Sequence, residues 1–221
     1  MSIEDNIAAV KQRIAVACKR AGRSPDEVTL VAVSKTFGPE AIRTAHELGI
    51  RHFGENRVQE AAGKIRELSR LEPRPTWHLV GHLQTNKVRK AVGIFDIIHS
   101  LDSVRLAEAL SRHARQASVL LEVNMAGEAS KSGFALAEVG PALEDISRLP
   151  QLEVKGLMTM APWVTDAEEV RPLFRKLRSL RDSLGLEHLS MGMTDDFEVA
   201  IEEGATLVRI GRAIFGERRT D

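Results

Sequence analysis

The sequence predicts an α/β protein built as a single (β/α)8 barrel of the TIM type, with an extra helix before the first strand. Eight short runs of apolar or β-branched residues alternate with longer segments of helical period, which is the pattern of a parallel sheet, and eight strands close a barrel. The length of 221 residues suits one large domain, residues 1–221. An open doubly wound sheet is the alternative, and it is disfavoured because no GxGxxG motif follows the first run.

The predicted strands are the runs richest in Val, Ile and Leu, and polar residues or glycines bound most of them. The first run, VTLVAVSK, is typical of a central strand that is buried on both faces. In chain order the strands are predicted at 28–35, 51–55, 76–81, 95–100, 118–125, 153–160, 187–192 and 206–211.

The predicted helices are the segments in which apolar residues recur at three- and four-residue spacing. In chain order they are predicted at 3–22, 39–49, 55–68, 85–93, 103–116, 136–149, 166–185 and 195–204. Asp102 or Ser103 can cap one of them and Asp166 another, because their side-chain oxygens accept hydrogen bonds from free N–H groups. Four of the predicted ranges end at a glycine, a residue that commonly ends helices, at Gly49, Gly93, Gly185 and Gly204.

The composition gives no indication of a nucleic acid or membrane partner. The formal net charge is +0, the sequence pI is about 7.1, and no apolar run approaches the roughly 20 residues of a membrane span. The first twenty residues lack the cationic flank and apolar stretch of a signal peptide. The single cysteine, Cys18, cannot form an internal disulfide, so we expect a cytoplasmic protein in which Cys18 packs inside the first helix.

Lys35 is the first candidate functional residue, because barrels of this type carry their chemistry where the strands end. Counting back by twos places it on the same apolar face as Val33 and Val31. A poorly hydrated lysine has a lowered pKa, and its neutral amine forms a Schiff base with an aldehyde. The alternative is a lysine whose stem lies along the apolar surface while its ammonium group reaches water.

The last two strand ends predict an anion site. SMGMTDD (190–196) and RIGRAIFG (209–216) place glycines and hydroxyls before turns of helix, where backbone N–H groups favour a phosphate. The barrel closes strand eight against strand one, so this site lies beside Lys35. An aldehyde that carries a phosphate fits both ends, and pyridoxal 5′-phosphate (PLP) is such a molecule.

Six motifs, in order over nearly the whole chain, resemble a known family. They are AVSKT (32–36), HFGENRVQE (52–60), WHLVGHLQTNK (77–87), SKSGF (130–134), GLMTM (156–160) and the long stretch 189–216. The chain resembles the pyridoxal-phosphate homeostasis proteins, which share the N-terminal barrel of alanine racemase. The resemblance implies that Lys35 holds PLP as an internal aldimine. It also implies a carrier that keeps the free aldehyde low, without turnover, with apo PLP-dependent enzymes as possible recipients.

The resemblance also implies which side chains surround the cofactor. It places Asn56 and His78 near the ring and Arg209 opposite the pyridine nitrogen. It assigns phosphate contacts to Ser190, Gly192, Thr194, Gly211 and the backbone of Arg212. Many members have threonine at position 212, so a side-chain hydroxyl contact is not expected there, although an arginine can add positive charge.

Two of these residues have a structural alternative. Asn56 and Glu55 can instead satisfy N–H groups at the start of a helix. Arg209 can instead form a buried ion pair. If Arg209 does face the ring nitrogen, it disfavours protonation there and restrains carbanion chemistry.

Two enzyme functions are the alternatives to a carrier. An amino-acid racemase needs a second proton-transfer group opposite the lysine, and this sequence has no tyrosine. His78, His82 and His99 stand at candidate positions, where each can equally be a hydrogen-bonding scaffold residue. A Schiff-base aldolase needs an acid beside the lysine, and Glu55 is the obvious one.

The remaining polar residues indicate no further site. We expect Lys131 to be an exposed loop residue, with capture of a second cofactor molecule as the alternative, and Glu60 to face solvent. No His, Cys or Asp set has metal-ligand spacing, so no metal is expected. We expect a monomer, because the predicted helices show no long exposed apolar stripe.

Overall fold

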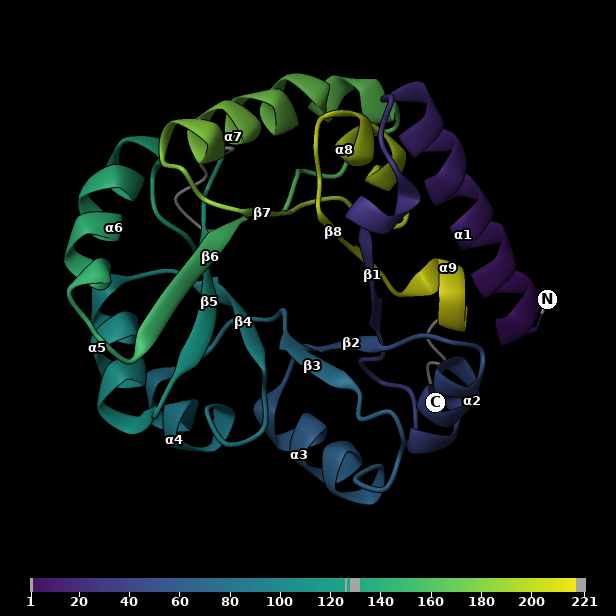
Figure 1. Ribbon diagram of the computed structural model, residues 1–221, viewed down its shortest axis with the longest axis horizontal. Helices are drawn as coiled ribbons and strands as arrows, with labels where there is room; N and C mark the ends of the chain where they lie inside the picture. The colour runs from purple at the N-terminus through teal and green to yellow at the C-terminus, as the bar shows by residue number, and fades with distance from the viewer. Residues whose placement is uncertain (1, 126, 128–131, 218–221) are drawn as a thin grey trace.

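The computed structural model describes residues 2–125, 127 and 132–217. Eight parallel strands form a closed barrel in chain order, and the helices surround it (Figure 1). This confirms the predicted barrel and the helix before it. The strands are β1 Thr29–Val33, β2 His52–Glu55, β3 Thr76–Leu79, β4 Ile97–Leu101, β5 Ala117–Glu122, β6 Leu152–Met158, β7 His188–Ser190 and β8 Leu207–Ile210.

The helices lie close to the predicted ranges. They are α1 Ile3–Arg20, α2 Pro39–Glu47, α3 Val58–Glu67, α4 Val88–Ala91, α5 Val104–His113, α6 Val139–Ser147, α7 Arg171–Ser183, α8 Phe197–Glu202 and α9 Arg212–Phe215. Short 3-10 turns precede four elements: η1 Pro25–Glu27, η2 Thr85–Lys87, η3 Leu136–Glu138 and η4 Ala167–Val170. Ser103 caps α5 by accepting from Leu106 N, and Asp166 caps η4 by accepting from Glu168 N. Both predicted caps are therefore confirmed.

Six of the eight strands end one to three residues earlier than predicted. β1, for example, ends at Val33, because the next residues leave the ladder and form a turn in which Phe37 N donates to Ser34 O. Ser34 and Lys35, expected at the end of the first strand, therefore lie in the first residues of the following loop, whereas Ser190 and Arg209 lie within β7 and β8.

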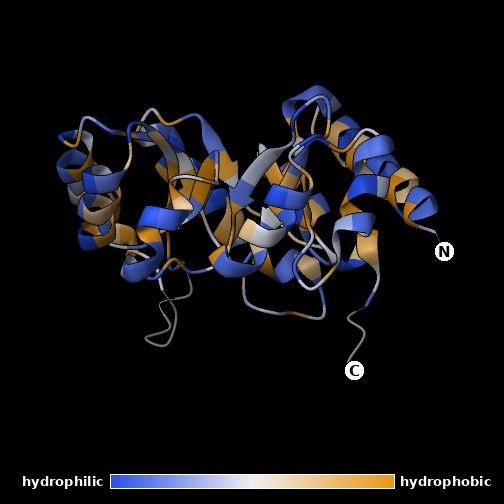
Figure 2. Cartoon of the chain, turned by 90° about the horizontal axis from the view of Figure 1, so that it is seen from below, coloured by the Kyte–Doolittle hydropathy of each residue, from blue (hydrophilic) through white to orange (hydrophobic). Residues whose placement is uncertain are grey.

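Two apolar layers stabilise the barrel. A small cluster of Val31, Leu120, Met158 and Leu207 fills part of the interior. A much larger cluster lies between the strands and the surrounding helices. Figure 2 accordingly shows hydrophobic colour concentrated in the strands and on the helix sides that face them. Because Val31 belongs to the interior cluster, the alternation predicted along β1 is confirmed.

Helix α1 packs on the outside of the barrel, beside α8 and α9 (Figure 1). Its apolar side is buried, and Cys18 lies on that side, fully buried, as predicted. Arg13 of α1 lies over the ring of Phe197, with the guanidinium carbon 4.5 Å from the ring centroid, and pairs with Glu198 at 2.9 Å. These contacts tie α1 to α8, the helix that follows one of the predicted anion-binding loops.

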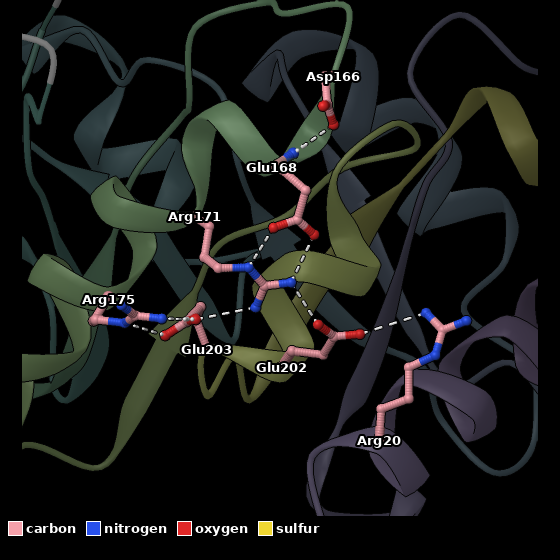
Figure 3. A network of polar contacts seen from close by, with 7 residues as sticks. All are labelled: Arg20, Asp166, Glu168, Arg171, Arg175, Glu202 and Glu203. Carbon is pink, nitrogen blue, oxygen red and sulfur yellow. Dashed lines mark hydrogen bonds and ion pairs between the residues drawn. The ribbon is translucent and has the colours of Figure 1, made fainter.

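A network of ion pairs joins α7, α8 and α1 on the outer surface (Figure 3). Arg171 contacts Glu168 at 2.6 Å, Glu202 at 2.6 Å and Glu203 at 3.0 Å. Arg175 adds a second pair with Glu203 at 2.9 Å. The hydrogen bonds that Arg171 donates to Glu168, Glu202 and Glu203 raise its pKa above the usual value. Within the described residues, no helix is both long enough and apolar enough to cross a membrane.

Candidate functional site

A cavity of about 550 Å³ opens at the C-terminal ends of β1, β2, β7 and β8. Three basic residues that the sequence selected line it: Lys35, Arg209 and Arg212. Its lining residues are Val33, Lys35, Thr36, Phe37, Asn56, Val80, Met160, Met193, Thr194, Asp195, Arg209, Gly211, Arg212, Gly216 and Glu217. A cavity of this size is in the range, roughly 300–1,000 Å³, that holds small-molecule ligands.

Lys35 lies in a tight turn directly after β1. It is half-buried and lines the cavity together with Val33. The next residue, Thr36, has a φ of 70°, a left-handed conformation that costs energy for a residue with a branched side chain. The turn therefore needs support from its neighbours to keep this shape.

A buried ion cluster, formed by Lys64, Glu55 and Glu60, supplies this support. Lys64 of α3 donates to Ser34 O at 2.8 Å, to Glu55 at 2.8 Å and to Glu60 at 2.7 Å. Glu60 in turn accepts from the backbone N–H of Thr36 at 2.7 Å. Both neighbours of Lys35 in the chain are thus tied to one ammonium group. The expectation that Glu60 faces solvent is wrong, because its carboxylate binds this turn.

Glu55 belongs to the same cluster and not to the cavity lining. It is fully buried at the end of β2, where one oxygen accepts from Lys64 and from Ser34 Oγ. Burial raises the pKa of this carboxyl group, while the hydrogen bonds from Lys64 and Ser34 lower it. Neither Glu55 nor Asn56 caps α3, whose N-cap is Arg57 without a side-chain hydrogen bond.

Asn56 follows Glu55 and does line the cavity. The loop after β3 passes against its backbone at Gly81. A Cβ atom at Gly81 would lie 2.4 Å from Asn56 O and 2.8 Å from Asn56 Cα, which is closer than atoms can approach. The absence of a side chain at Gly81 therefore allows Asn56 to take its position.

The far side of the cavity is formed by the loops after β7 and β8. Thr194 and Asp195 come from the first loop, and Gly211 and Arg212 from the second. Arg212 bridges the loops, with its Nη2 atom 2.7 Å from Asp195 Oδ2. The first N–H groups of α9 have no carbonyl partner inside the helix.

Two glycines allow these loops to approach their neighbours. A Cβ atom at Gly192, which has a φ of 91°, would lie 2.6 Å from Ala200 Cβ on α8. At Gly211 it would lie 3.1 Å from Val33 O on β1. Phe37 and Phe215 add a ring contact, with centroids 5.2 Å apart, between the Lys35 turn and α9. The two predicted halves of the site, the amine and the anion site, therefore lie side by side.

Arg209 lies on β8 between these halves, level with Val31 of β1. Its guanidinium is buried and donates to Ser190 Oγ at 2.6 Å and to Thr159 O at 2.8 Å. Neither acceptor is a carboxylate, so these bonds differ from the ion pair considered as the alternative. Burial lowers the pKa of Arg209 to about 10, against the opposing effect of Asp196 and Glu122. The group is therefore a cation at neutral pH.

Three of the nine predicted cofactor residues lie outside the cavity lining. They are His78, Ser190 and Gly192. His78 and Ser190 are fully buried behind Arg209 in a chain of hydrogen bonds with His99. His82 lies in a separate surface pocket, where Nδ1 is 3.0 Å from Asp102. Lys131 lies outside the described residues.

The sequence patterns did not single out several residues that shape the site. Thr36, Phe37, Met160 and Met193 line the cavity from loops, and no residue spacing selects them. Lys64 gave no signal either, because it occupies an ordinary helical position and its role depends on contacts across the fold. Among the described residues, no group of three or more His, Cys, Asp or Glu side chains is arranged to hold a metal ion.

The fold and the cavity define a class of protein: a TIM-type barrel that presents a lysine at the end of its first strand. The family described as "Alanine racemase, N-terminal domain" matches residues 6–219. The chain also resembles alanine racemase of Clostridium difficile in fold, with a TM-score of 0.72 over 98% of this chain and 58% of that one, at 13% identity.

Closer relatives cover the whole chain. The pyridoxal phosphate homeostasis protein of Aquifex aeolicus is 45% identical over 99% of this chain and 100% of its own, and that of Escherichia coli is 42% identical over 98% and 97%. PipY of Synechococcus elongatus, solved with PLP bound, is 40% identical, with a TM-score of 0.84 over 97% of this chain and 100% of that one. The chain belongs to the pyridoxal phosphate homeostasis protein family, as its motifs predicted.

Proposed function

We propose that this protein binds PLP in the cavity and acts in PLP homeostasis. The observation that carries the proposal is the meeting, in one cavity, of Lys35 with Thr194, Gly211 and Arg212. The residues present fit the cofactor: an amine stands at one end, backbone N–H groups and an arginine at the other, and a cationic guanidinium between them. The relative PipY, with the same barrel, was solved with PLP bound.

Each group has a distinct role in this proposal. Bound PLP supplies an aldehyde that reacts reversibly with amines. Lys35 would supply the amine that holds this aldehyde. Thr194, Gly211 and Arg212 would bind the phosphate, and Asn56 would orient the ring. Arg209 would keep the ring nitrogen unprotonated, because a neighbouring cation disfavours a second positive charge.

The roles of the three residues outside the lining are proposed to be indirect. His78 and Ser190 would act through Arg209, and Gly192 would shape the loop that carries Thr194. We further propose that the chain works in the cytoplasm as a single-domain monomer and passes its cofactor to apo PLP-dependent enzymes.

The cavity supports a carrier better than an enzyme. A racemase needs a proton-transfer group facing Lys35, and the described lining residues include no histidine, while the sequence has no tyrosine. Asp195 is paired with Arg212. The aldolase candidate acid, Glu55, is bound to Lys64 outside the lining. We therefore propose that the protein binds and releases PLP without turnover.

The test is a covalent map of the cofactor. Protein mixed with PLP is expected to gain a long-wavelength absorbance, and borohydride is expected to fix one cofactor on the peptide that contains Lys35. Lys35→Ala should lose both signals and keep its circular dichroism spectrum. The matched control, Lys90→Ala, removes an exposed lysine of α4 and should behave as the unmodified chain. A label on another lysine, or no uptake at all, would overturn the proposal.

A further inference from the structure

A chain of five polar side chains crosses the barrel interior from Arg209 to His52. Arg209 Nη1 lies 2.6 Å from Ser190 Oγ, which lies 2.8 Å from His99 Nδ1. His99 Nε2 lies 2.8 Å from His78 Nδ1, and His78 Nε2 lies 2.9 Å from His52 Nδ1. Strands β8, β7, β4, β3 and β2 contribute one residue each. All but His52 are buried.

We propose that Arg209 imposes a single proton order on this chain, and that Ser190, His99 and His78 are positioning residues for its guanidinium. A guanidinium group only donates hydrogen bonds. Ser190 Oγ therefore accepts from Arg209. Its own proton needs an acceptor, because a buried hydroxyl left unpaired is costly. Within the described structure, the other partner of this hydroxyl is His99 Nδ1.

The same reasoning assigns the protonated nitrogen of each histidine ring in turn. A neutral imidazole has one donor and one acceptor nitrogen. If His99 accepts at Nδ1, it carries its proton on Nε2 and donates to His78 Nδ1. His78 must then carry its proton on Nε2 and donate to His52 Nδ1. The reverse order would place a second donor against Ser190 and leave the hydroxyl proton without an acceptor.

The surroundings keep the rings neutral, as this order requires. Burial, followed by the charges of His52 and His188, lowers the pKa of His78 to about 3. Burial also lowers the pKa of His99 well below its usual value, with smaller effects from His78 and Arg209. Because both buried rings are neutral, each keeps one donor and one acceptor nitrogen, and the proton order is retained.

The hydrogen bonds to Arg209 affect how its guanidinium is oriented toward the cavity. Ser190 Oγ and Thr159 O bind two of its N–H groups from behind, and Arg209 also lines the cavity. The chain therefore restricts rotation of the guanidinium. The proton order itself is independent of any cofactor, whereas its effect on PLP affinity rests on the proposed function.

The first experiment reads the proton order directly in protein without PLP. Long-range ¹H–¹⁵N correlation spectra of labelled protein distinguish protonated from unprotonated ring nitrogens, and single His→Gln variants assign the signals. His52, His78 and His99 are all expected as neutral rings protonated at Nε2 near neutral pH. His46 is an internal reference, because its Nε2 lies 2.8 Å from Pro73 O, an acceptor only. A proton on Nδ1 in His78 or His99 overturns the proposal.

The second experiment removes the link between Arg209 and the rings. Ser190→Ala is expected to release the order, so that His99 and His78 show mixed or reversed protonation. Ser100→Ala is the matched control for the spectra. Ser100 is also buried, but its hydroxyl donates to Gly81 O and takes no part in the series of hydrogen bonds from Arg209 to His52. It should keep the Nε2 pattern. An unchanged pattern in Ser190→Ala contradicts the role of Arg209.

A PLP titration separates this proposal from the proposed function. Ser190→Ala is expected to bind PLP about tenfold more weakly than the unmodified protein, because the guanidinium loses one of its two acceptors. If Ser190→Ala binds as tightly as the unmodified protein, the positioning role is wrong even where the spectra confirm the order. If no variant binds PLP, including the unmodified chain, the proposed function fails while the proton order stands on the spectra alone.

Discussion

Lys64 shows how a single buried side chain shapes the reactive turn without touching the cavity. Its ammonium group binds the carbonyl before Lys35 and, through Glu60, the N–H group after it. The same ammonium neutralises Glu55, which is fully buried. The position of Lys35 therefore depends on a residue that lies 29 positions further along the chain.

Lys64→Met is expected to destabilise the protein by about 3 kcal/mol, because breaking a buried ion pair leaves Glu55 uncompensated. PLP uptake should also weaken, because the turn loses its support. Urea unfolding measures the first effect and PLP titration the second. Lys155→Met is the matched control: Lys155 pairs with Glu153 near the surface on β6, and a much smaller loss than in Lys64→Met is expected, because exposed ion pairs contribute little. Equal losses in both variants would contradict the supporting role of Lys64.

At the scale of elements, the barrel mouth depends on how closely its loops pass one another. The loop after β3 rests on Asn56 because Gly81 has no side chain. By contrast, Gly63 lies on the exposed side of α3, where a Cβ atom would have no other atom within 4 Å. We therefore expect Gly81 to be sensitive to substitution and Gly63 to tolerate it.

Gly81→Ala is expected to displace Asn56 and lower PLP affinity about tenfold or more, since the new methyl group would overlap backbone atoms. Gly63→Ala should instead stabilise the protein by about 0.5–1 kcal/mol, because alanine restricts the unfolded chain and favours the helix. PLP titration and thermal unfolding of both variants provide the measurements. If Gly81→Ala binds PLP normally, PLP binding does not depend on the present position of Asn56.

The ion network of Figure 3 joins three helices, α1, α7 and α8. Arg171→Leu is expected to cost about 1–2 kcal/mol, because Glu202 and Glu203 are largely covered and lose a shared partner. Arg148→Leu, which breaks an exposed pair with Asp145, should cost less than about 0.5 kcal/mol. The difference should shrink in high salt, because salt screens partly exposed charges. A salt-independent difference would indicate lost packing and not lost charge.

The sequence predicted those features that depend on short spacing. Strand alternation placed Lys35 on the face of Val31, and the caps at Ser103 and Asp166 follow from residues a few positions apart. The Arg209 chain could not be predicted in the same way. His99 and Ser190 are 91 positions apart, and only the closed barrel brings them within 2.8 Å. The sequence identified the polar residues of the strands, but it did not identify their hydrogen-bond partners.

At the scale of the whole molecule, the histidines in the barrel interior link stability to pH. In the folded protein the pKa of His78 is lowered to about 3, and those of His52 and His99 are also lowered, with burial as the largest cause. At these histidines the unfolded chain therefore binds more protons than the folded one below about pH 6.5. Their contribution to the free energy of unfolding is complete above that pH and falls as the pH decreases.

Carboxyl groups act in the opposite direction. Burial raises the pKa of Glu55, Glu122 and Asp196, so the folded protein takes up protons there before the unfolded chain does. Their stabilising contribution is present at low pH and is lost as the pH rises through their folded-state pKa values. The total pH dependence is a sum of both effects, and a comparison between variants is needed to isolate the histidines.

His78→Gln isolates one histidine of the chain. From pH 6.5 to pH 5, the unmodified protein is expected to lose about 1.5 kcal/mol more of its free energy of unfolding than this variant, because glutamine takes up no proton. The measurement is urea unfolding at both pH values. His113→Gln, at an exposed position on α5, is the control and should follow the unmodified protein. If His78→Gln shows the same pH dependence as that control, His78 is protonated in the folded barrel over this range, and the neutral chain behind Arg209 does not exist.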